Sequence, residues 1–497
     1  MCSPSVMVGI RLLALTAPVL ALQHTPSAAI SSTRSHPVKP AAQPVLLALR
    51  SRQRTAAPLL TAAVATPEQP PQGATVSASI INLAKNIVGS GVLTLAAGVA
   101  AFSGSKLALI PSLAILLFLS GVSAYSFSSI ARVGEAVGGT TYRDTWAKVF
   151  PPKTAILPAA TVTIMTFTAG LAYSIIIGDS FASIASLAGL PPTLQRPNVW
   201  IVLVSTLVLF PLCLLRDLSS LAIGSVLGTA GTLYTALFMA LRCIDGSYAP
   251  GGKFFSAIAP AVQPRFVPVT PATPVVNLSI FVLISMLATA FLAHYNAPKF
   301  YNELAPPKDG GSKVGRFNLV CGGAFGLAAL LCGLIMSMGF LTFGAASQGL
   351  ILNNYATKDT FAFLARMGIG ASIIFSYPLN FAGFREGVLS MTGLGKFAHR
   401  RDLHIASTVL LMLSTNGLAL FMKDLGLIAA LGGAILGSAL VYIFPALMFI
   451  ANGRKALKAK ADKGENANGL KAEVGANYAL LVLGFFLAVV GAVMSLK

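Results

Sequence analysis

The chain has 497 residues, of which 55% are hydrophobic and 10% are charged, and its formal net charge is +20. A soluble domain carries about 25% charged residues, and a disordered chain is richer in charge and poorer in apolar residues, so both classes are excluded. The mean hydropathy of +0.78 instead predicts a protein that crosses a membrane many times.

Residues 1–76 differ in composition from the rest of the chain. Arg11 precedes an apolar run over 12–22, which has the length of a signal peptide and is too short to span a bilayer. The stretch after it is rich in Ser, Ala, Pro and Arg, and no acidic residue appears before Glu68, as in organelle transit peptides. The order of the two runs resembles the bipartite leaders of complex plastids. We therefore expect a targeting or disordered region and an organelle membrane, either the plastid envelope or a vacuolar or other endomembrane; a disordered cytosolic tail is the alternative.

Apolar runs of roughly 17–28 residues alternate with short polar stretches after this region, which is the signal of transmembrane helices. We predict an all-α integral membrane protein with about eleven transmembrane helices, and residues 77–497 as its transmembrane domain. The predicted spans are 77–101, 106–131, 154–177, 199–215, 219–241, 275–297, 316–343, 360–382, 404–421, 425–450 and 476–496.

The distribution of Lys and Arg predicts the orientation. If the N-terminus of the domain is cytoplasmic, the cytoplasmic loops hold 19 basic residues and the opposite loops hold seven. The positive-inside rule therefore favours a cytoplasmic N-terminus and, with an odd number of spans, a C-terminus on the far side. The basic surplus is explained by topology and targeting, so nucleic acid is not an expected partner.

The first predicted span breaks the rules for a membrane helix. Gly89 and Gly91 flank Ser90 near the middle of the membrane, which weakens the helix where unsatisfied backbone groups are costly. Such a break persists where it faces a cavity and where a ligand binds the freed backbone groups. Close packing of helices through small residues is the alternative, but Asn82, Lys85 and Asn86, one to two turns earlier, favour a binding site.

The first span resembles the opening motif of the amino acid/auxin permease family, which includes neutral amino acid transporters and vacuolar amino acid transporters. Asn82, Gly89 and Gly91 match that motif, and Lys85 stands where the family has a second Asn. Further similarities follow in chain order. They are 290–294 and 300–304 around the end of the sixth span, 339–344 at the end of the seventh, Arg366, Pro378 and 384–385 in the eighth, and 426–445 in the tenth.

The resemblance implies two inverted five-helix repeats, spans 1–5 and 6–10, followed by an eleventh helix, with discontinuous helices 1 and 6. It also implies that an amino acid binds between these two broken spans. Its carboxylate would meet the N–H groups of Gly89, Ser90 and Gly91 at the start of a half-helix. Its ammonium would meet carbonyls freed by unwinding between Ser285 and Thr289, although family members have a proline where Ser285 stands.

Lys85 is a cation at membrane depth, and three interpretations of it stay open. It acts as a tethered cation where Na⁺ sits in Na⁺-coupled relatives, it carries a proton, or it extends to the inner membrane surface. The first two argue against simple Na⁺ coupling. Asn82 and Ser376 nevertheless match positions that look like Na⁺ ligands in relatives, so both H⁺ and Na⁺ remain candidate coupling ions.

Four further residues are candidates for gating or pH sensing. His294, at the cytoplasmic end of the sixth span, is a candidate pH sensor or a hydrogen-bonded structural residue. Arg366, in the eighth span, either lines the vestibule or forms a structural pair. Glu303 and Arg385 flank inner loops, where they form either a cytoplasmic gate or a screened surface pair.

We expect a secondary active transporter of amino acids, with neutral L-amino acids favoured and acidic ones as an alternative because of Lys85. A Na⁺-independent exchanger and a membrane sensor that binds an amino acid without transporting it are the other hypotheses. The chain has no nucleophile-elbow, HExxH or P-loop sequence, and its five cysteines form no CxxC pair. No enzyme activity, metal or cofactor other than the coupling ion is predicted, and the expected partners are the amino acid and the lipid bilayer.

Overall fold

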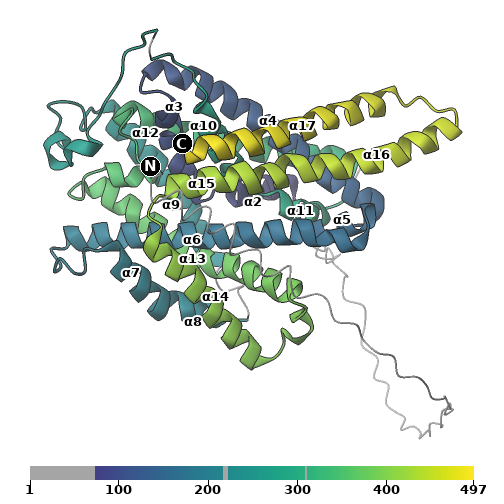
Figure 1. Cartoon of the computed structure of the whole chain (residues 1–497), viewed down its shortest axis with the longest axis horizontal. Helices are drawn as coiled ribbons and strands as arrows, with labels where there is room; N and C mark the ends of the chain where they lie inside the picture. Colours follow the sequence, from purple (N-terminus) through teal and green to yellow (C-terminus); the bar gives the residue numbers. More distant parts are fainter. Residues whose placement is uncertain (1–72, 217–221, 272, 308–309) are drawn as a thin grey trace, which may run out of the picture. The chain divides into compact units, whose positions relative to one another are not determined.

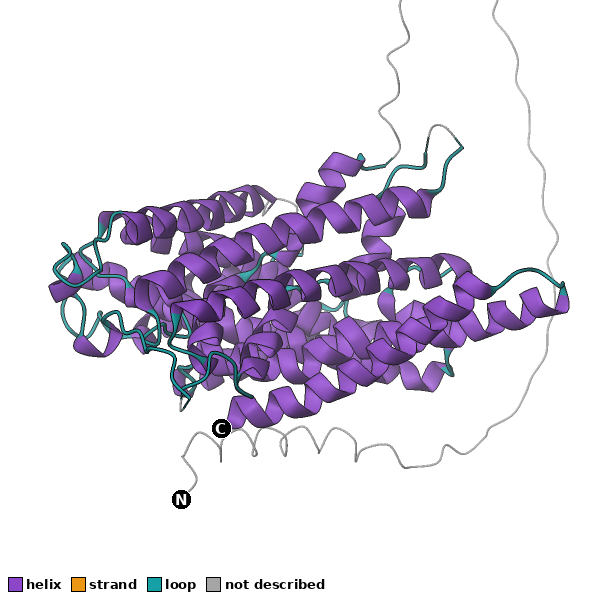
Figure 2. Ribbon diagram, turned by 90° about the horizontal axis from the view of Figure 1, so that it is seen from above, coloured by secondary structure: helices purple, strands orange, loops and turns teal. Residues whose placement is uncertain are grey.

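The computed structural model describes residues 73–216, 222–271, 273–307 and 310–497. The predicted targeting region therefore lies, up to residue 72, outside the described residues. Helices dominate the described part, which contains isolated β-bridges but no β-strand (Figure 2). The first half of the domain contains α2 (Val76–Ile87), α3 (Leu95–Phe102), α4 (Leu109–Val137), α5 (Tyr142–Val149), α6 (Ile156–Leu187), α7 (Pro197–Val204), α8 (Phe210–Leu214) and α9 (Ala222–Ile244). The second half contains α10 (Ile280–Ala290), α11 (Ala297–Glu303), α12 (Lys313–Phe343), α13 (Thr360–Met391), α14 (Arg401–Phe421), α15 (Leu425–Gly432), α16 (Phe444–Asp462) and α17 (Asn468–Leu496).

The predicted spans coincide with these helices. Nine helices among the described residues are long and apolar enough to cross a membrane, or ten if α2 and the bent segment after it form one span. α9 is outside this count, and its 23 residues cover most of the predicted fifth span. The prediction of an all-helical protein with many spans is confirmed.

Polar residues at the helix ends explain several boundaries. The side chains of Ser312, Asp359 and Asp424 accept hydrogen bonds from the first backbone N–H groups of α12, α13 and α15. Such caps satisfy donors that have no partner inside the helix. At the C-terminus of α4, Gly138 adopts a left-handed conformation with φ of 68°, which terminates the helix.

Helices from the two halves of the domain pack against one another. α13 packs along α6 and α9, α12 packs against α2 and α4, and α10 contacts α3, α15 and α17. α16 and α17 run side by side as a helical hairpin (Figure 1). Large apolar side chains such as Phe118, Leu330, Leu410 and Val482 are more than 60% exposed. A surface of this kind is unfavourable in water and suits contact with lipid.

The chain just before the first span pairs with the chain just after the sixth. Ala74 N–H donates to the carbonyl of Glu303 at 2.8 Å, and Ala305 N–H donates to the carbonyl of Ala74 at 3.0 Å. Gly73 allows this approach, because a Cβ at Gly73 would lie 2.7 Å from the Cα of Ala305. The N-terminal end of the first span and the C-terminal end of the sixth are therefore joined through their backbones.

Candidate functional site

The first span is broken at the predicted glycines. α2 ends at Ile87, Gly89 is extended (φ −101°, ψ −161°), and a 3-10 turn, η2 (Ser90–Thr94), continues into α3. The axis bends by 49° at this break. Gly89 N–H donates to the carbonyl of Ile87 at 2.9 Å, whereas the N–H groups of Ser90 and Gly91 donate to no acceptor in the described residues. The break thus presents two backbone donors rather than the three that we predicted.

The sixth span is also broken, but the predicted position was wrong. Residues from Ser285 to Thr289 are helical, and α10 continues to Ala290 before an irregular stretch over 291–293. Because Ser285 replaces the family's proline, its N–H is available to the helix and nothing ends α10 there. The Oγ of Ser285 donates to the carbonyl of Phe281 at 2.7 Å, and the residue is buried away from the cavity described below.

The irregular stretch frees carbonyl groups that a helix would use. Phe291 N–H still reaches the carbonyl of Leu287, and Leu292 N–H reaches that of Thr289. The carbonyls of Ala290, Phe291 and Leu292 accept no hydrogen bond from the described residues. The break in the sixth span therefore offers acceptors, while the break in the first offers donors.

A cavity of about 120 Å³ lies between these two breaks. A single water requires about 10–15 Å³ of such volume, so the cavity has room for a solute of several non-hydrogen atoms. Residues from five predicted spans line it, the first, third, sixth, eighth and tenth. They are Asn86, Ile87, Gly89, Ser90, Gly91 and Thr94; Met165, Thr166, Thr168, Ala169, Ala172 and Tyr173; Thr289, Ala290, Leu292 and Tyr295; Asn380; and Leu425, Ile428, Ala429 and Gly432.

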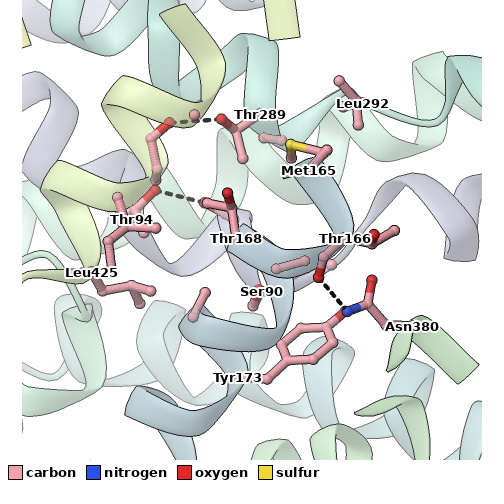
Figure 3. A pocket seen from close by; sticks show the side chains of 18 of the residues that line it. Ser90, Thr94, Met165, Thr166, Thr168, Tyr173, Thr289, Leu292, Asn380 and Leu425 are labelled. Atoms are coloured by element: carbon pink, nitrogen blue, oxygen red, sulfur yellow. Dashed lines mark hydrogen bonds between the residues drawn. The ribbon is translucent and has the colours of Figure 1, made fainter. Parts of the chain in front are cut away.

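The lining combines uncharged polar side chains with apolar ones and contains no charged side chain. Figure 3 shows Ser90, Thr94, Thr168, Thr289 and Asn380 around the cavity. The Oγ1 of Thr94 donates to the carbonyl of Gly91 at 2.8 Å, and that of Thr289 donates to the carbonyl of Ala429 at 2.6 Å. These bonds fix the two threonines and connect the sixth span to α15.

Asn380 connects the third and eighth spans. Its Nδ2 donates to the carbonyl of Thr166 at 2.7 Å, which leaves its Oδ1 without a partner in the described part of the chain (Figure 3). Sequence reasoning missed Asn380, Thr166, Thr168 and Tyr173. Polar residues inside predicted spans were the available signal, but their side of the helix depends on tertiary packing.

The three predicted ion-coupling residues do not line the cavity. Asn82 is exposed on α2, and Lys85, on the last turn of α2, is half-buried and has no hydrogen-bond or ion-pair partner among the described residues. Ser376 is half-buried on α13, about one turn before Asn380. No side-chain hydrogen bond or ion pair joins these three residues to one another among the described residues.

His294 and Arg366 lie outside the cavity and hold neighbouring segments. His294 is fully buried, and its Nε2 lies 2.9 Å from Ser126 Oγ and 3.1 Å from the carbonyl of Ser123 on α4. Nη2 of Arg366 donates to the carbonyls of Leu352 and Tyr355 at 2.8 and 2.7 Å. Both environments correspond to the structural alternatives given above, because their partners are parts of the fold.

Glu303 and Arg385 do not pair with each other. Glu303 is exposed and lies 4.0 Å from Lys299 on the same helix. Arg385 Nη1 donates to the carbonyl of Cys213 at 2.9 Å and to Thr408 Oγ1 at 2.8 Å, which joins α13 to α8 and α14. The predicted gate between Glu303 and Arg385 is therefore not formed in this structure.

Comparison with known proteins adds to this geometry. Residues 72–496 match the model of the family described as "Transmembrane amino acid transporter protein". A zebrafish (Danio rerio) protein named "Putative sodium-coupled neutral amino acid transporter 11" is 25% identical over 84% of this chain and 86% of its own length. "Vacuolar amino acid transporter 5" of Schizosaccharomyces pombe is 27% identical over 75% of this chain and 83% of its own length.

A solved structure shows the same fold. The inward-facing conformation of Mhp1 superposes with a TM-score of 0.50 at 13% identity, covering 88% of this chain and 94% of its own. At this identity the likeness concerns the fold alone, which is of the LeuT type. Transporters of this type bind their substrates at discontinuous helices near the membrane midplane.

Proposed function

Since the chain belongs to the transmembrane amino acid transporter family, we propose that it transports neutral L-amino acids by alternating access, coupled to H⁺ or Na⁺. The family consists of membrane transporters rather than enzymes. The proposal concerns the charge of the substrate, the place where it binds and the coupling ion.

The uncharged lining of the cavity carries the proposal. A neutral amino acid brings a carboxylate and an ammonium, and the two helix breaks offer backbone partners for both. The carboxylate would accept hydrogen bonds from the N–H groups of Ser90 and Gly91, where the start of η2 and α3 carries positive partial charge. The ammonium would donate to the carbonyls of Ala290 and Leu292. A second charge on the substrate would find no countercharge, and burying an unpaired ion is strongly unfavourable.

The apolar part of the lining supports a hydrophobic or small side chain on the substrate. Met165, Leu292, Leu425 and Ile428 contribute apolar surface to the cavity. Apolar walls with a few placed polar groups are typical of small-molecule sites. We therefore expect selection by side-chain size among neutral amino acids.

Lys85 is our candidate for the coupling residue. It stands less than two turns before the break and has no partner among the described residues. A cation at that position would replace a bound Na⁺ or carry H⁺, whereas Asn82 and Ser376 are the candidates if Na⁺ binds. Uptake into proteoliposomes under an imposed pH gradient or an imposed Na⁺ gradient, repeated with Lys85→Asn, separates these cases. Unchanged coupling and affinity in Lys85→Asn would contradict this role.

Counterflow of labelled amino acids in proteoliposomes containing the full chain tests the function itself. We expect neutral amino acids to be exchanged and aspartate and lysine to compete poorly. Strong competition by either charged amino acid would contradict the argument from the lining. Binding of a neutral amino acid without counterflow would instead identify a sensor.

We further propose that the protein resides in an organelle membrane. The basic, acid-poor region over 1–76 supports this location, and one similar protein is named a vacuolar transporter. A fluorescent fusion of the full chain, compared with the same fusion lacking residues 1–72, tests it. Identical distribution at the plasma membrane in both cases would overturn the proposal.

A further inference from the structure

A second cavity, of about 300 Å³, lies at the ends of α4, α12 and α17 and shares no residue with the first. It is lined by Ala124, Tyr125, Ser128, Arg132, Asn318, Cys321, Gly322 and Glu473. This set contains a cation, an anion, an amide and two hydroxyls beside three small or apolar residues. None of these residues has a role in the transport proposal.

Three polar residues of this cavity lie equally far from their helix ends, whereas Ser128 and Tyr125 lie deeper, nine and twelve residues from the end of α4. Arg132 is five residues from the end of α4, Asn318 is five residues from the start of α12, and Glu473 is five residues from the start of α17. At 1.5 Å per residue, each lies about 7–8 Å inside its helix end. The positive-inside rule places all three ends on the cytoplasmic side. The cavity therefore faces the headgroup layer, which is about 5–8 Å thick on each side of the hydrocarbon core.

An ion pair forms one wall of the cavity. Nη2 of Arg132 lies 2.7 Å from Oε1 of Glu473, and the hydroxyl of Tyr125 donates to the same oxygen at 3.1 Å. The guanidinium also lies over the rings of Tyr125 and Phe449, at 5.6 and 5.1 Å from their centroids. The pair is thus held in place, and its net charge is zero.

Several polar groups around the pair have no protein partner among the described residues. Ser128 Oγ donates to Asn318 Oδ1, so the Nδ2 of Asn318 is left as an unused donor. The Nε–H of Arg132 also lacks an acceptor, but it is buried, so only the remaining N–H groups of the guanidinium can reach a ligand. Glu473 uses Oε1 for both of its contacts, which leaves Oε2 as an unused acceptor. Donors and an acceptor for a ligand are therefore adjacent.

We propose that this cavity binds the headgroup of a zwitterionic phospholipid that carries a primary ammonium, such as phosphatidylethanolamine. The phosphate accepts hydrogen bonds from Arg132 and Asn318, and the ammonium donates to Oε2 of Glu473. An anionic headgroup would leave Oε2 of Glu473 without a donor and would be repelled by that carboxylate, and a quaternary ammonium has no N–H to donate. A lipid is favoured over a soluble zwitterion because exposed apolar side chains, such as Leu319 and Val482, provide surface for acyl chains on the same helices.

The test uses the purified full chain in bilayers of phosphatidylcholine alone, or with one fifth phosphatidylethanolamine or phosphatidylglycerol. We expect phosphatidylethanolamine to raise the thermal unfolding midpoint and to be retained several-fold over the other two lipids in native mass spectrometry. In Glu473→Gln the preference for phosphatidylethanolamine over phosphatidylcholine should fall to about one to one. A larger effect of phosphatidylglycerol, or an unchanged preference in Glu473→Gln, would overturn the proposal.

A second variant is needed because Glu473→Gln breaks the ion pair with Arg132 and could destabilise the fold. Asn318→Leu leaves this ion pair intact. In phosphatidylcholine its unfolding midpoint should fall only by the loss of the hydrogen bond from Ser128, and phosphatidylethanolamine should no longer raise that midpoint. Asp402→Asn, in an exposed ion pair with Arg400, is the matched control and should retain the lipid preference. Stabilisation in detergent by soluble phosphoethanolamine equal to that by the lipid would overturn the assignment to a lipid.

Discussion

Two adjacent glycines in the tenth span provide a sharp test of how the sixth and tenth spans pack. A Cβ at Gly433 would lie 1.7 Å from the carbonyl oxygen of Ser285 and 2.6 Å from Thr289 Oγ1. A Cβ at Gly432 would lie 3.5 Å from Thr168 Cγ2, an ordinary contact distance, and would point toward the cavity. Gly433→Ala and Gly432→Ala therefore add the same methyl group to two different surroundings.

The magnitudes predict opposite effects on stability. Replacing Gly by Ala inside a helix gains about 0.8–1 kcal/mol of helix propensity at either position. A carbon–oxygen contact of about 3.3 Å requires α10 and the tenth span to separate by about 1.6 Å in Gly433→Ala. Overpacking of this kind costs about 1–3 kcal/mol, and a backbone oxygen cannot rotate away, so we expect the upper end of that range. The loss in Gly433→Ala thus exceeds the gain, while Gly432→Ala keeps the gain and should be slightly more stable than the wild type.

Two assays on the same preparations separate the variants. Thermal unfolding in detergent should show a lower midpoint for Gly433→Ala only, and counterflow should be lost in that variant. Gly432→Ala should unfold at or above the midpoint of the wild type and raise the KM for large neutral amino acids more than for small ones. A Gly433→Ala protein that is as stable and active as the wild type would refute the described contact between α10 and the tenth span.

Four further predictions follow from other contacts. Arg242→Ala should lower the free energy of unfolding by about 3–5 kcal/mol, because the fully buried Asp359 loses the two hydrogen bonds at 2.8 Å that Arg242 donates. Thermal unfolding measures this loss, and a loss as small as that of Asp402→Asn would contradict the prediction. Asn380→Ala should raise the KM for neutral amino acids about tenfold in counterflow, because it removes a polar side chain that lines the cavity. The unfolding midpoint should fall only slightly, because a single hydrogen bond, to the carbonyl of Thr166, is lost. Arg366→Met should increase proteolysis and hydrogen exchange over 351–355, whose carbonyls the guanidinium holds, and an unchanged exchange rate there would exclude this role. Burial alone would raise the pKa of Asp245, but hydrogen bonds from Ser247 and Arg242 lower this pKa below its ordinary value. The stabilisation by Asp245 is therefore present above the ordinary pKa and is lost as the pH falls through the lowered pKa. The difference in unfolding midpoint between the wild type and Asp245→Asn should shrink at acidic pH.

The broad architecture could be predicted because hydropathy and glycine position are properties of the sequence itself. Each predicted span overlaps a helix, and the break around Gly89 lies where helix propensity falls. The break in the sixth span could not be located in the same way. Nothing in the sequence of α10 distinguishes Thr289 from Phe291 as the point of unwinding, since neither is Gly or Pro. Tertiary contacts decide it, among them the bond from Thr289 to Ala429.

The candidate site was only partly predictable for a related reason. Gly89, Ser90, Gly91 and Thr289, which we predicted to contact the substrate, line the cavity, and their contact with the substrate stays a prediction. Asn380 and Tyr173 lie in spans whose polar residues occur on more than one face, so their direction depends on the packing of α6 against α13. Arg366 was identified as unusual, but its partners are loop carbonyls, which a sequence does not reveal.

The backbone pairing of Ala74 with Glu303 and Ala305 has a consequence for maturation and for motion. If a targeting peptide is removed, cleavage on the C-terminal side of residue 74 would also remove this pairing, so a mature protein that retains it must begin earlier. The pairing ties α2 to α11, and Asn296 Nδ2 donates to Asn86 Oδ1 at 3.1 Å between the same two half-spans. We therefore expect α2 and α11 to move together as one rigid body, so that the exit at their end of the protein opens in a single step.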